Sequence, residues 1–519
     1  MQEYKKRSTL QITLVLTTIT IVCKILGFLK NSLLAYYFGT SPVVDAYVMT
    51  FSIGTITCGW VAGLIGNFTP VFKKIESENG VVRALKFAGN VHSYIFGLVL
   101  LFAGILGIIA PTVVKIIAPG FNEITYNYTV HFFRLYLISI VFYSSYRFGN
   151  EFLHCNQRHI AASAPDVVMS TCCIISIIGS SYLGESFLIY GYVIALLLQC
   201  VITICFSYKI GFKILLKPKW DENMNRLLIM AVPIFLSNTL AEINTLVDKM
   251  FASKLTSGTV AALDYANTMK EFLSQIGTMA IVAVIFPIFS KLWAEGDVEA
   301  FKDKVMQLLQ MLAVLYIPVT AGVIAIGDLI IEIVFKRGQF DDKAAFITTN
   351  AFIIYSLALF ALSLRGVFLK AFYSMQKTRY ILMVSGANVF LNVFLNFILV
   401  KHYGYIGLAL ATSIAALSCL PIYFYCFRRE IPSVRYRSFI IKCIKSLVAS
   451  IGMFFIIHQF KINITYLFDK SLVGLALLIV LLMGSGLIIY ILIGLCIKIE
   501  EVEMVVKYIR GKILTNRNT

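Results

Sequence analysis

Apolar stretches long enough to cross a membrane recur along the whole chain, with only short polar connections between them. A helix needs about 20 apolar residues to cross ~30 Å of hydrocarbon, and none of the stretches alternates as the strands of a barrel do. The pattern therefore predicts an all-α polytopic membrane protein with about fourteen transmembrane helices. The segments lie near residues 12–38, 43–72, 88–118, 128–155, 161–183, 187–209, 224–253, 264–294, 303–334, 346–374, 381–401, 404–427, 438–458 and 472–497.

The composition agrees with this pattern. Of 519 residues, 59% are hydrophobic and 14% are charged, and the mean hydropathy of +0.83 exceeds that of ordinary soluble domains. No small-residue cleavage site follows the basic start, so we expect the first segment to remain as a helix. The 11 cysteines are scattered without metal-type spacing, which predicts neither a disulfide framework nor a zinc site.

Basic residues gather in alternate connections, and this accounts for the net charge of +18 without a nucleic-acid partner. By the positive-inside rule, these connections lie in the cytoplasm, which predicts cytoplasmic termini and an even number of spans. Opposite connections such as 39–42 and 184–186 carry no basic residue. The basic set is Lys5, Lys6, Arg7, Lys73, Lys74, Arg83, Lys86, Lys209, Lys213, Lys217, Lys219, Arg428, Arg429, Arg435 and Arg437.

A short internal repeat predicts how the segments are grouped. The second and eighth segments end in a Pro-x-Phe pattern followed by lysine, and Pro70 and Pro287 are 217 positions apart. We expect an N-terminal six-helix half at 1–216 and a second at 217–430, related by an axis along the membrane normal. Residues 431–519 would add two transmembrane helices and a cytoplasmic tail. The alternative, that this pattern merely ends a helix at an interface, stays open.

Two lysines lie inside the first apolar segment. A cation at the centre of a bilayer costs about 2.5–3.5 kcal/mol, so Lys24 and Lys30 should face water or a partner. Six residues of helix turn the second side chain roughly 120° from the first, which lets both reach one broad cavity. We expect both to contact substrate, the alternatives being a structural ion pair for Lys24 and snorkelling for Lys30.

Further charges lie at the starts of both halves, so we expect helices one, two, seven and eight to line the cavity. The predicted substrate-binding residues are Lys24, Lys30, Asp45, Lys270 and Glu271, although Asp45 equally fits a helix-start role. The opposite signs of Glu242, Asp248 and Lys249 favour pairing, which predicts a gate or ion coupling.

No motif in the chain is typical of catalysis, so we expect a transporter rather than an enzyme, with no cofactor. Since no nucleotide-binding domain is present, transport would draw on an ion gradient, the membrane potential or a substrate gradient. Arg134 and Arg147 in the fourth segment, and Arg365 and Lys370 in the tenth, lie nearer helix ends or contacts between helices, which favours structural roles.

Several motifs resemble one family. The segments Lys24–Lys30, Ala35–Gly39, Tyr265–Phe272, Ala371–Thr378 and Gly407–Ser413 are similar to those of MurJ/MviN-type lipid II flippases. That family belongs to the multidrug/oligosaccharidyl-lipid/polysaccharide exporter superfamily. The resemblance extends over essentially the whole chain, and the helix count agrees with it.

This resemblance implies a multi-pass flippase of the bacterial cytoplasmic membrane. Such a protein moves a polyprenyl-pyrophosphate-linked saccharide, as lipid II, from the inner to the outer leaflet by alternating access. Cavity cations would engage the pyrophosphate, and the two C-terminal helices would form a groove for the lipid tail. The implied partners are the lipid-linked saccharide and membrane lipids. We expect a monomer, and whether an ion is coupled stays open.

The chain departs from the family at several positions. Lys24 and Lys30 stand where arginine is usual, which keeps the charge and loses bidentate phosphate recognition. The usual basic residue of the second span is absent at Cys58–Trp60, and Thr268 occupies an arginine position, whereas Glu271 matches. One alternative is therefore a flippase whose cargo is a lipid-linked exopolysaccharide or capsule repeat unit. A second, different alternative is a cation-coupled small-molecule antiporter.

Overall fold

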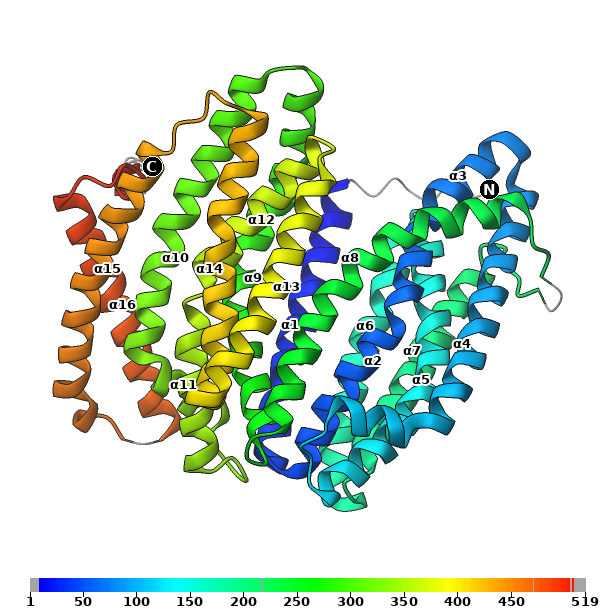
Figure 1. Cartoon of the computed structure of the whole chain (residues 1–519), viewed down its shortest axis with the longest axis horizontal. Helices are drawn as coiled ribbons and strands as arrows, with labels where there is room; N and C mark the ends of the chain where they lie inside the picture. Colours follow the sequence, from blue (N-terminus) through cyan, green and yellow to red (C-terminus); the bar gives the residue numbers. More distant parts are fainter. Residues whose placement is uncertain (1–8, 216–217, 470, 505, 508–519) are drawn as a thin grey trace. The chain divides into compact units, whose positions relative to one another are not determined.

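The computed structural model describes residues 9–215, 218–469, 471–504 and 506–507, and these residues form long α-helices joined by short connections (Figure 1). The side chains of residues 9–14, 232–234, 236–238, 240–241 and 276–284 lie outside the description, as do the basic residues Lys5, Lys6, Arg7 and Lys217 and the predicted tail from 508 onward. The helices are α1 Thr9–Phe38, α2 Pro42–Gly66, α3 Phe68–Asn79, α4 Val81–Ile117, α5 Glu123–Cys155, α6 His159–Leu183, α7 Phe187–Tyr208, α8 Glu222–Ser253, α9 Thr259–Ala294, α10 Val298–Phe335, α11 Asp342–Ser356, α12 Leu359–Ser374, α13 Thr378–Tyr403, α14 Tyr405–Glu430, α15 Arg437–Ile464 and α16 Leu472–Cys496, with a 3₁₀ turn at Thr465–Leu467.

Each predicted apolar segment coincides with one helix or with a pair of helices. The second segment is divided into α2 and α3, and the tenth into α11 and α12. The axes of α11 and α12 meet at an angle of 46°. Among the described residues, 10 helices are long and apolar enough to cross a membrane, or 11 if α11 and α12 form one span. Helices α5, α8 and α9 fall outside this set. Helix α5 carries charged residues along its length, whereas side chains in the middle of α8 and α9 lie outside the description. The all-helical membrane architecture is confirmed, and the count of fourteen stays a prediction.

The chain divides into two compact units. The first comprises Met1–Ala261 with Arg337–Asp341, and the second comprises Ala262–Lys336 with Asp342–Thr519. The boundary lies inside α9, whereas the sequence repeat placed it after residue 216. A compact unit is defined by contacts in the fold, whereas the predicted halves are defined by a repeat in the sequence. The division into units therefore does not test the two six-helix halves and the separate C-terminal pair, which stay a prediction.

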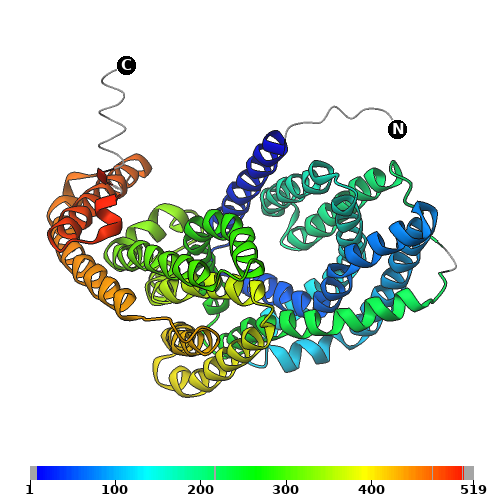
Figure 2. The same ribbon diagram turned by 90° about the horizontal axis from the view of Figure 1, so that it is seen from above.

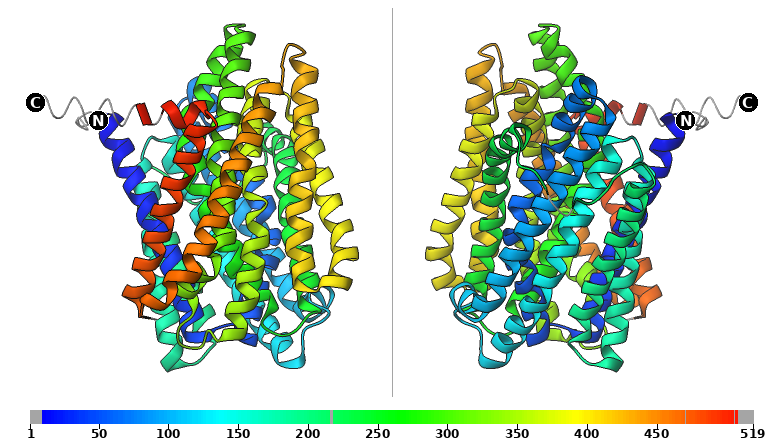
Figure 3. Two further views of the ribbon diagram at one scale, coloured as in Figure 1. Left: turned by 90° about the vertical axis from the view of Figure 1, so that its left-hand side faces the viewer. Right: turned by 90° about the vertical axis from the view of Figure 1, so that its right-hand side faces the viewer.

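In the first unit, α2 packs against α5 and α8, α5 packs against α4 and α7, and α6 packs against α1 and α7 (Figures 2 and 3). A group of buried phenylalanines fills the space between α3, α5 and the segment after α7. Phe72 meets Phe152 edge to face with ring centroids 5.7 Å apart, and Phe152 lies 5.4 Å from Phe212. Aromatic rings in such arrangements contribute packing energy beyond the area they bury.

A buried carboxylate joins α2 to the start of α9 within this unit. Asp45 is only 2% exposed, and its Oδ2 accepts a hydrogen bond from the N–H of Gly258 at 2.6 Å. Its Oδ1 accepts another from the N–H of Ala261 at 2.8 Å. The first N–H groups of a helix lack partners within the helix, and its N-terminus favours negative charge. Asp45 therefore satisfies two backbone donors that would otherwise be unpaired.

The segment 337–341 packs against the turn that follows α1. The N–H of Gln339 donates to the carbonyl of Tyr36 at 2.9 Å. Gly39 and Gly338 have φ of +54° and +59°, and a Cβ on Gly338 would lie 2.2 Å from the Tyr36 oxygen. Glycine is required at Gly338 both for the left-handed backbone and for this close approach.

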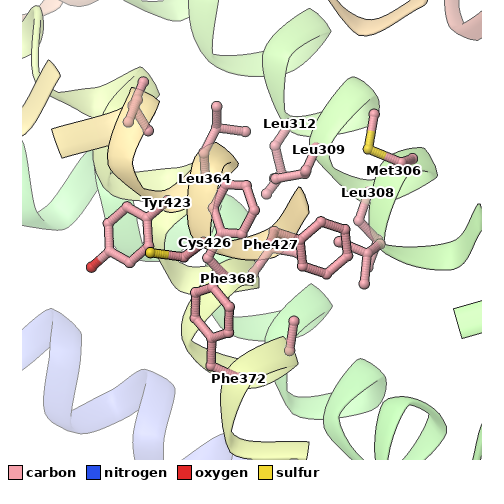
Figure 4. Close-up of a cluster of buried hydrophobic side chains, with 14 of the residues drawn as sticks. Met306, Leu308, Leu309, Leu312, Leu364, Phe368, Phe372, Tyr423, Cys426 and Phe427 are labelled. Atoms are coloured by element: carbon pink, nitrogen blue, oxygen red, sulfur yellow. The ribbon is translucent and has the colours of Figure 1, made fainter. Parts of the chain in front are cut away.

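The core of the second unit is formed by α10, α12 and α14, and Figure 4 shows its centre. Phe368 and Phe372 of α12 lie among Tyr423 and Phe427 of α14, with the Phe368 and Tyr423 rings stacked at 5.5 Å. Leu309 and neighbouring side chains of α10 close the cluster. The packing is dense because aromatic and branched side chains interdigitate.

Helices α15 and α16 pack on α10 in the same unit, joined by polar contacts (Figure 3). The Nζ of Lys461 lies 2.6 Å from both carboxylate oxygens of Asp328. Deeper in the helices, the hydroxyl of Tyr490 donates to the carbonyl of Val314 at 2.9 Å, and Ser446 Oγ lies 2.9 Å from the same hydroxyl. Hydrogen bonds between helices hold such elements together where lipid supplies no hydrophobic drive.

We expect Asp45→Asn to destabilise the first unit, because an amide group would turn a donor towards one of the two N–H groups. The expected loss is about 1.5–3 kcal/mol, the range for hydrogen bonds to charged groups. Thermal unfolding of the purified protein in detergent measures it. The matched control is Asp221→Asn at the exposed N-cap of α8, where asparagine caps as well as aspartate. Equal melting temperatures for both variants would contradict the structural role of Asp45.

Tyr490→Phe should loosen α16 by removing two hydrogen bonds while keeping the ring. We expect a loss of about 1 kcal/mol, typical of hydrogen bonds between membrane helices, read as a lower unfolding temperature. Tyr466→Phe serves as control, since Tyr466 is 79% exposed. A stability unchanged by Tyr490→Phe would show that apolar packing alone holds α16.

Candidate functional site

The two lysines of the first apolar segment both lie on α1, which packs against α6. Lys24 is exposed and Lys30 is half-buried. Lys30 is within electrostatic range of Cys173 on α6, and Cys23, next to Lys24, is within range of Asp166 on the same helix. These contacts place the cationic part of α1 beside α6 within the first unit.

A polar cluster lies between α5, α6 and α7 of this unit, formed by Tyr146, Asn150, Asp166 and Gln199. The Oδ1 of Asp166 accepts hydrogen bonds from the Tyr146 hydroxyl at 2.6 Å and from Gln199 Nε2 at 2.8 Å. The Nδ2 of Asn150 donates to the Ala162 carbonyl at 2.8 Å and to the Tyr146 hydroxyl at 3.3 Å. The cluster therefore presents hydroxyl, amide and carboxylate groups among helices that are otherwise apolar.

Arg147 lies next to this cluster on α5 and adds a cation beside its polar groups. Its side chain is half-buried, and within the described part of the chain its buried Nε has no hydrogen-bond partner. Tyr143 lies within electrostatic range of both Arg147 and Glu242 of α8. Tyr143 thus links the predicted gate residue Glu242 to an arginine for which the sequence favours a structural role.

The other predicted residues of the first unit differ in their surroundings. Asp45 uses both carboxylate oxygens on backbone N–H groups, which favours the helix-start alternative over substrate contact. Asp248 and Lys249 of α8 are half-buried, and each makes at least one polar, electrostatic or ring contact. Adjacent positions on a helix point about 100° apart, so these two side chains take different directions.

In the second unit, the predicted pair Lys270 and Glu271 meets at one asparagine. Lys270 is 7% exposed, and its Nζ donates to Asn267 Oδ1 at 2.5 Å. Asn267 Nδ2 donates in turn to Glu271 Oε1 at 3.0 Å. The ammonium group also lies 5.2 Å from the ring centroid of Tyr355 on α11, at cation–π distance. The buried lysine is thereby held on a network that ends in an exposed carboxylate.

The described residues contain no group of three His, Cys, Asp or Glu side chains that could hold a metal ion. What they offer is cations on α1, α5 and α9, and a set of neutral donors and acceptors beside Asp166. Such groups bind anions and hydroxyls.

Sequence reasoning missed the cluster around Asp166. Asp166 carried the same signal as Lys24, a charge inside an apolar segment, and the cost of burying charge would have found it. Tyr146, Asn150 and Gln199 are neutral and common in membrane helices, so no spacing along the chain singles them out.

Sequence comparisons with known proteins identify one family. The family model of the lipid II flippase MurJ matches residues 34–489. A probable lipid II flippase MurJ of Rhizobium meliloti (strain 1021) is 24% identical over 411 residues, 76% of this chain and 76% of that protein. Another, of Buchnera aphidicola subsp. Acyrthosiphon pisum (strain APS), is 23% identical over 491 residues, 88% of this chain and 96% of that protein.

Solved structures share the fold. The lipid II flippase MurJ in its inward closed conformation aligns with a TM-score of 0.79 at 21% identity, covering 93% of this chain and 98% of that one. An inward-facing multidrug resistance MATE family transporter of the MOP superfamily aligns with a TM-score of 0.66 at 14% identity, covering 81% and 99%. The fold is thus that of membrane transporters. Because the family model matches most of the chain, from residue 34 to residue 489, this protein belongs to the lipid II flippase MurJ family.

Proposed function

We propose that this protein is a flippase that moves lipid II, a polyprenyl-pyrophosphate-linked saccharide, from the inner to the outer leaflet by alternating access. The observation that carries the proposal is the family match over residues 34–489. Relatives named as probable lipid II flippases, similar along most of their own length, support it. The exopolysaccharide and antiporter alternatives have no comparable support.

Lys24 and Lys30 are the groups that we assign to the pyrophosphate. A pyrophosphate carries at least two negative charges, and a lysine binds phosphate as a compact point charge with three donors. Two such cations within about 9 Å along one helix can engage the two phosphates of one headgroup. The exposure of Lys24 supports this role, because an anion has to reach its ammonium group.

The cluster around Asp166 is suited to the saccharide. Sugars present many hydroxyl groups, which bind to carboxylates, amides and hydroxyls such as those of Asp166, Gln199 and Tyr146. We assign Lys270 and Glu271 to the same substrate from the second unit. The exposed Glu271 carboxylate accepts hydrogen bonds from hydroxyls, and buried Lys270 positions it through Asn267.

Glu242, Asp248 and Lys249 are proposed to act in gating or ion coupling. Glu242 and Arg147 both lie within electrostatic range of Tyr143, and an opposite-charge pair inside a membrane protein can break and re-form as the transporter changes state. We also propose that both termini are cytoplasmic, that the protein is a monomer, and that its two six-helix halves are related by an axis along the membrane normal.

Lys24→Ala is expected to reduce lipid II transport about ten- to a hundredfold, the equivalent of one hydrogen bond to a charged group. Lys24→Arg should retain activity because it keeps the charge. Complementation in a flippase-depleted bacterium and lipid II translocation in proteoliposomes measure both. Lys86→Ala, which removes an exposed cation of α4, is the control. Full activity of Lys24→Ala at normal expression would defeat the assignment of the pyrophosphate to Lys24.

The proposed action of Glu242 with Arg147 predicts non-additive effects on transport. In a double-mutant cycle with Glu242→Gln and Arg147→Gln, we expect a coupling energy of at least about 0.5 kcal/mol in the transport rate. Arg134→Gln is the control partner, because this exposed arginine lies on the same helix about 20 Å away. Additive effects in the first cycle would show that Glu242 acts without Arg147.

A further inference from the structure

A basic cavity lies in the second unit where α15 begins and α16 ends. Its volume is about 360 Å³, and its walls are the segment before α15, the first turns of α15 and the turn after α16. A cavity of this size accommodates a small ligand or a headgroup. The charged residues that line it are Arg435, Arg437, Lys442, Lys445, Lys498 and Glu500.

Part of this positive charge is compensated within the protein. The Nζ of Lys442 lies 2.8 Å from Glu500 Oε2 and 2.6 Å from Glu501 Oε1. The hydrogen bond from Lys442 lowers the pKa of Glu500, which keeps that carboxylate ionised. Lys445 donates to the backbone carbonyl of Lys498 at 2.8 Å. These contacts engage both lysines that α15 contributes to the cavity wall.

The remaining cations have no acceptor within the described structure. Arg435, Arg437 and Lys498 are exposed, and among the described residues no hydrogen bond or ion pair engages their charged groups. The first turn of α15 contains no acidic residue, and its N-cap Tyr436 makes no side-chain capping bond. Arg437 thus adds a cation at the positive end of a helix dipole, an arrangement that an anion would stabilise.

The backbone of Lys498 is held in a conformation that disfavours lysine. Its φ is +55°, at the position of the helix C-terminus where glycine is preferred. The hydrogen bond from Ile499 N–H to the Gly494 carbonyl at 2.8 Å closes this turn. Non-glycine residues in this region cost about 1–2 kcal/mol, and such strain often marks functional sites. A lysine here supplies a charge that glycine could not.

Apolar side chains continue from the cavity along α15. Ile441 lines it, and Ile440, Ile441 and Ile444 are 52%, 43% and 56% exposed. A ligand with an anionic head and an acyl tail would place the head among the cations and the tail along these isoleucines. An inorganic anion would contact only the cations.

We propose that this cavity binds the phosphate headgroup of an anionic phospholipid of the inner leaflet. Basic pockets between transmembrane helices on the cytoplasmic side are suited to such headgroups. Arg435, Arg437 and Lys498 contact the phosphate, and the exposed isoleucines of α15 contact the acyl chain. The cations of this site differ from the residues assigned to the pyrophosphate and the saccharide of lipid II. The proposal is therefore independent of which lipid-linked saccharide the protein carries.

Native mass spectrometry of the full chain in neutral detergent tests the site, with phosphatidylglycerol and phosphatidylcholine as probes. The wild type should retain phosphatidylglycerol preferentially. Arg437→Gln and Lys498→Gly should each weaken its affinity about fivefold, the effect of one cation near an anionic surface. Lys291→Gln should bind as the wild type does, because this exposed lysine in the last turn of α9 lies outside the cavity.

Lys498→Gly also separates binding from folding. Glycine relieves the backbone strain, so this variant should unfold at a temperature no lower than the wild type in the absence of lipid. Equal retention of the two phospholipids by the wild type would overturn the proposal, as would undiminished phosphatidylglycerol binding by both cavity variants. Competition by inorganic phosphate at the same concentration as the lipid would overturn the lipid assignment in favour of a free anion.

Discussion

The cost of placing charge among apolar helices governs the interior of this protein. An ion in hydrocarbon loses its hydration, so it needs a partner, a helix terminus or a ligand. Asp45 is compensated by two backbone N–H groups at the start of α9. Lys270 is compensated by Asn267 and by the ring of Tyr355. These contacts fix α2 against the start of α9 in one unit, and α9 against α11 in the other.

The same cost distinguishes charges with structural partners from those that we propose to act on the substrate or in gating. A carboxylate whose two oxygens already accept backbone hydrogen bonds, as in Asp45, has little capacity left for a ligand. Arg147 has a buried Nε without a hydrogen-bond partner in the described structure, and Lys24 is exposed. A transporter for an anionic lipid needs both kinds of charge, because some must hold the helices while others bind and release cargo.

The sequence is adapted to lipid as a solvent as well as to water. Helices α15 and α16 expose isoleucine and leucine over much of their surface, and they are attached to α10 by a few polar bonds, among them those of Tyr490 and Lys461. Where hydrocarbon surrounds a helix, apolar side chains gain little by leaving it, and directional polar contacts decide the packing. The basic cavity at the start of α15 offers polar contacts of the same kind to the headgroup of a lipid.

The sequence by itself determined the helical membrane architecture, the segments that form helices and the lysines of α1, because hydropathy and the cost of charge in lipid act locally along the chain. It left Asp45 open between helix start and cavity, and it assigned Arg147 to structure. Only the tertiary structure decided that Asp45 binds backbone groups more than 200 positions away, that Arg147 and Glu242 both lie within electrostatic range of Tyr143, and that Tyr146 and Gln199 meet at Asp166. These contacts join different helices, and their geometry depends on packing, which no spacing along one chain reveals.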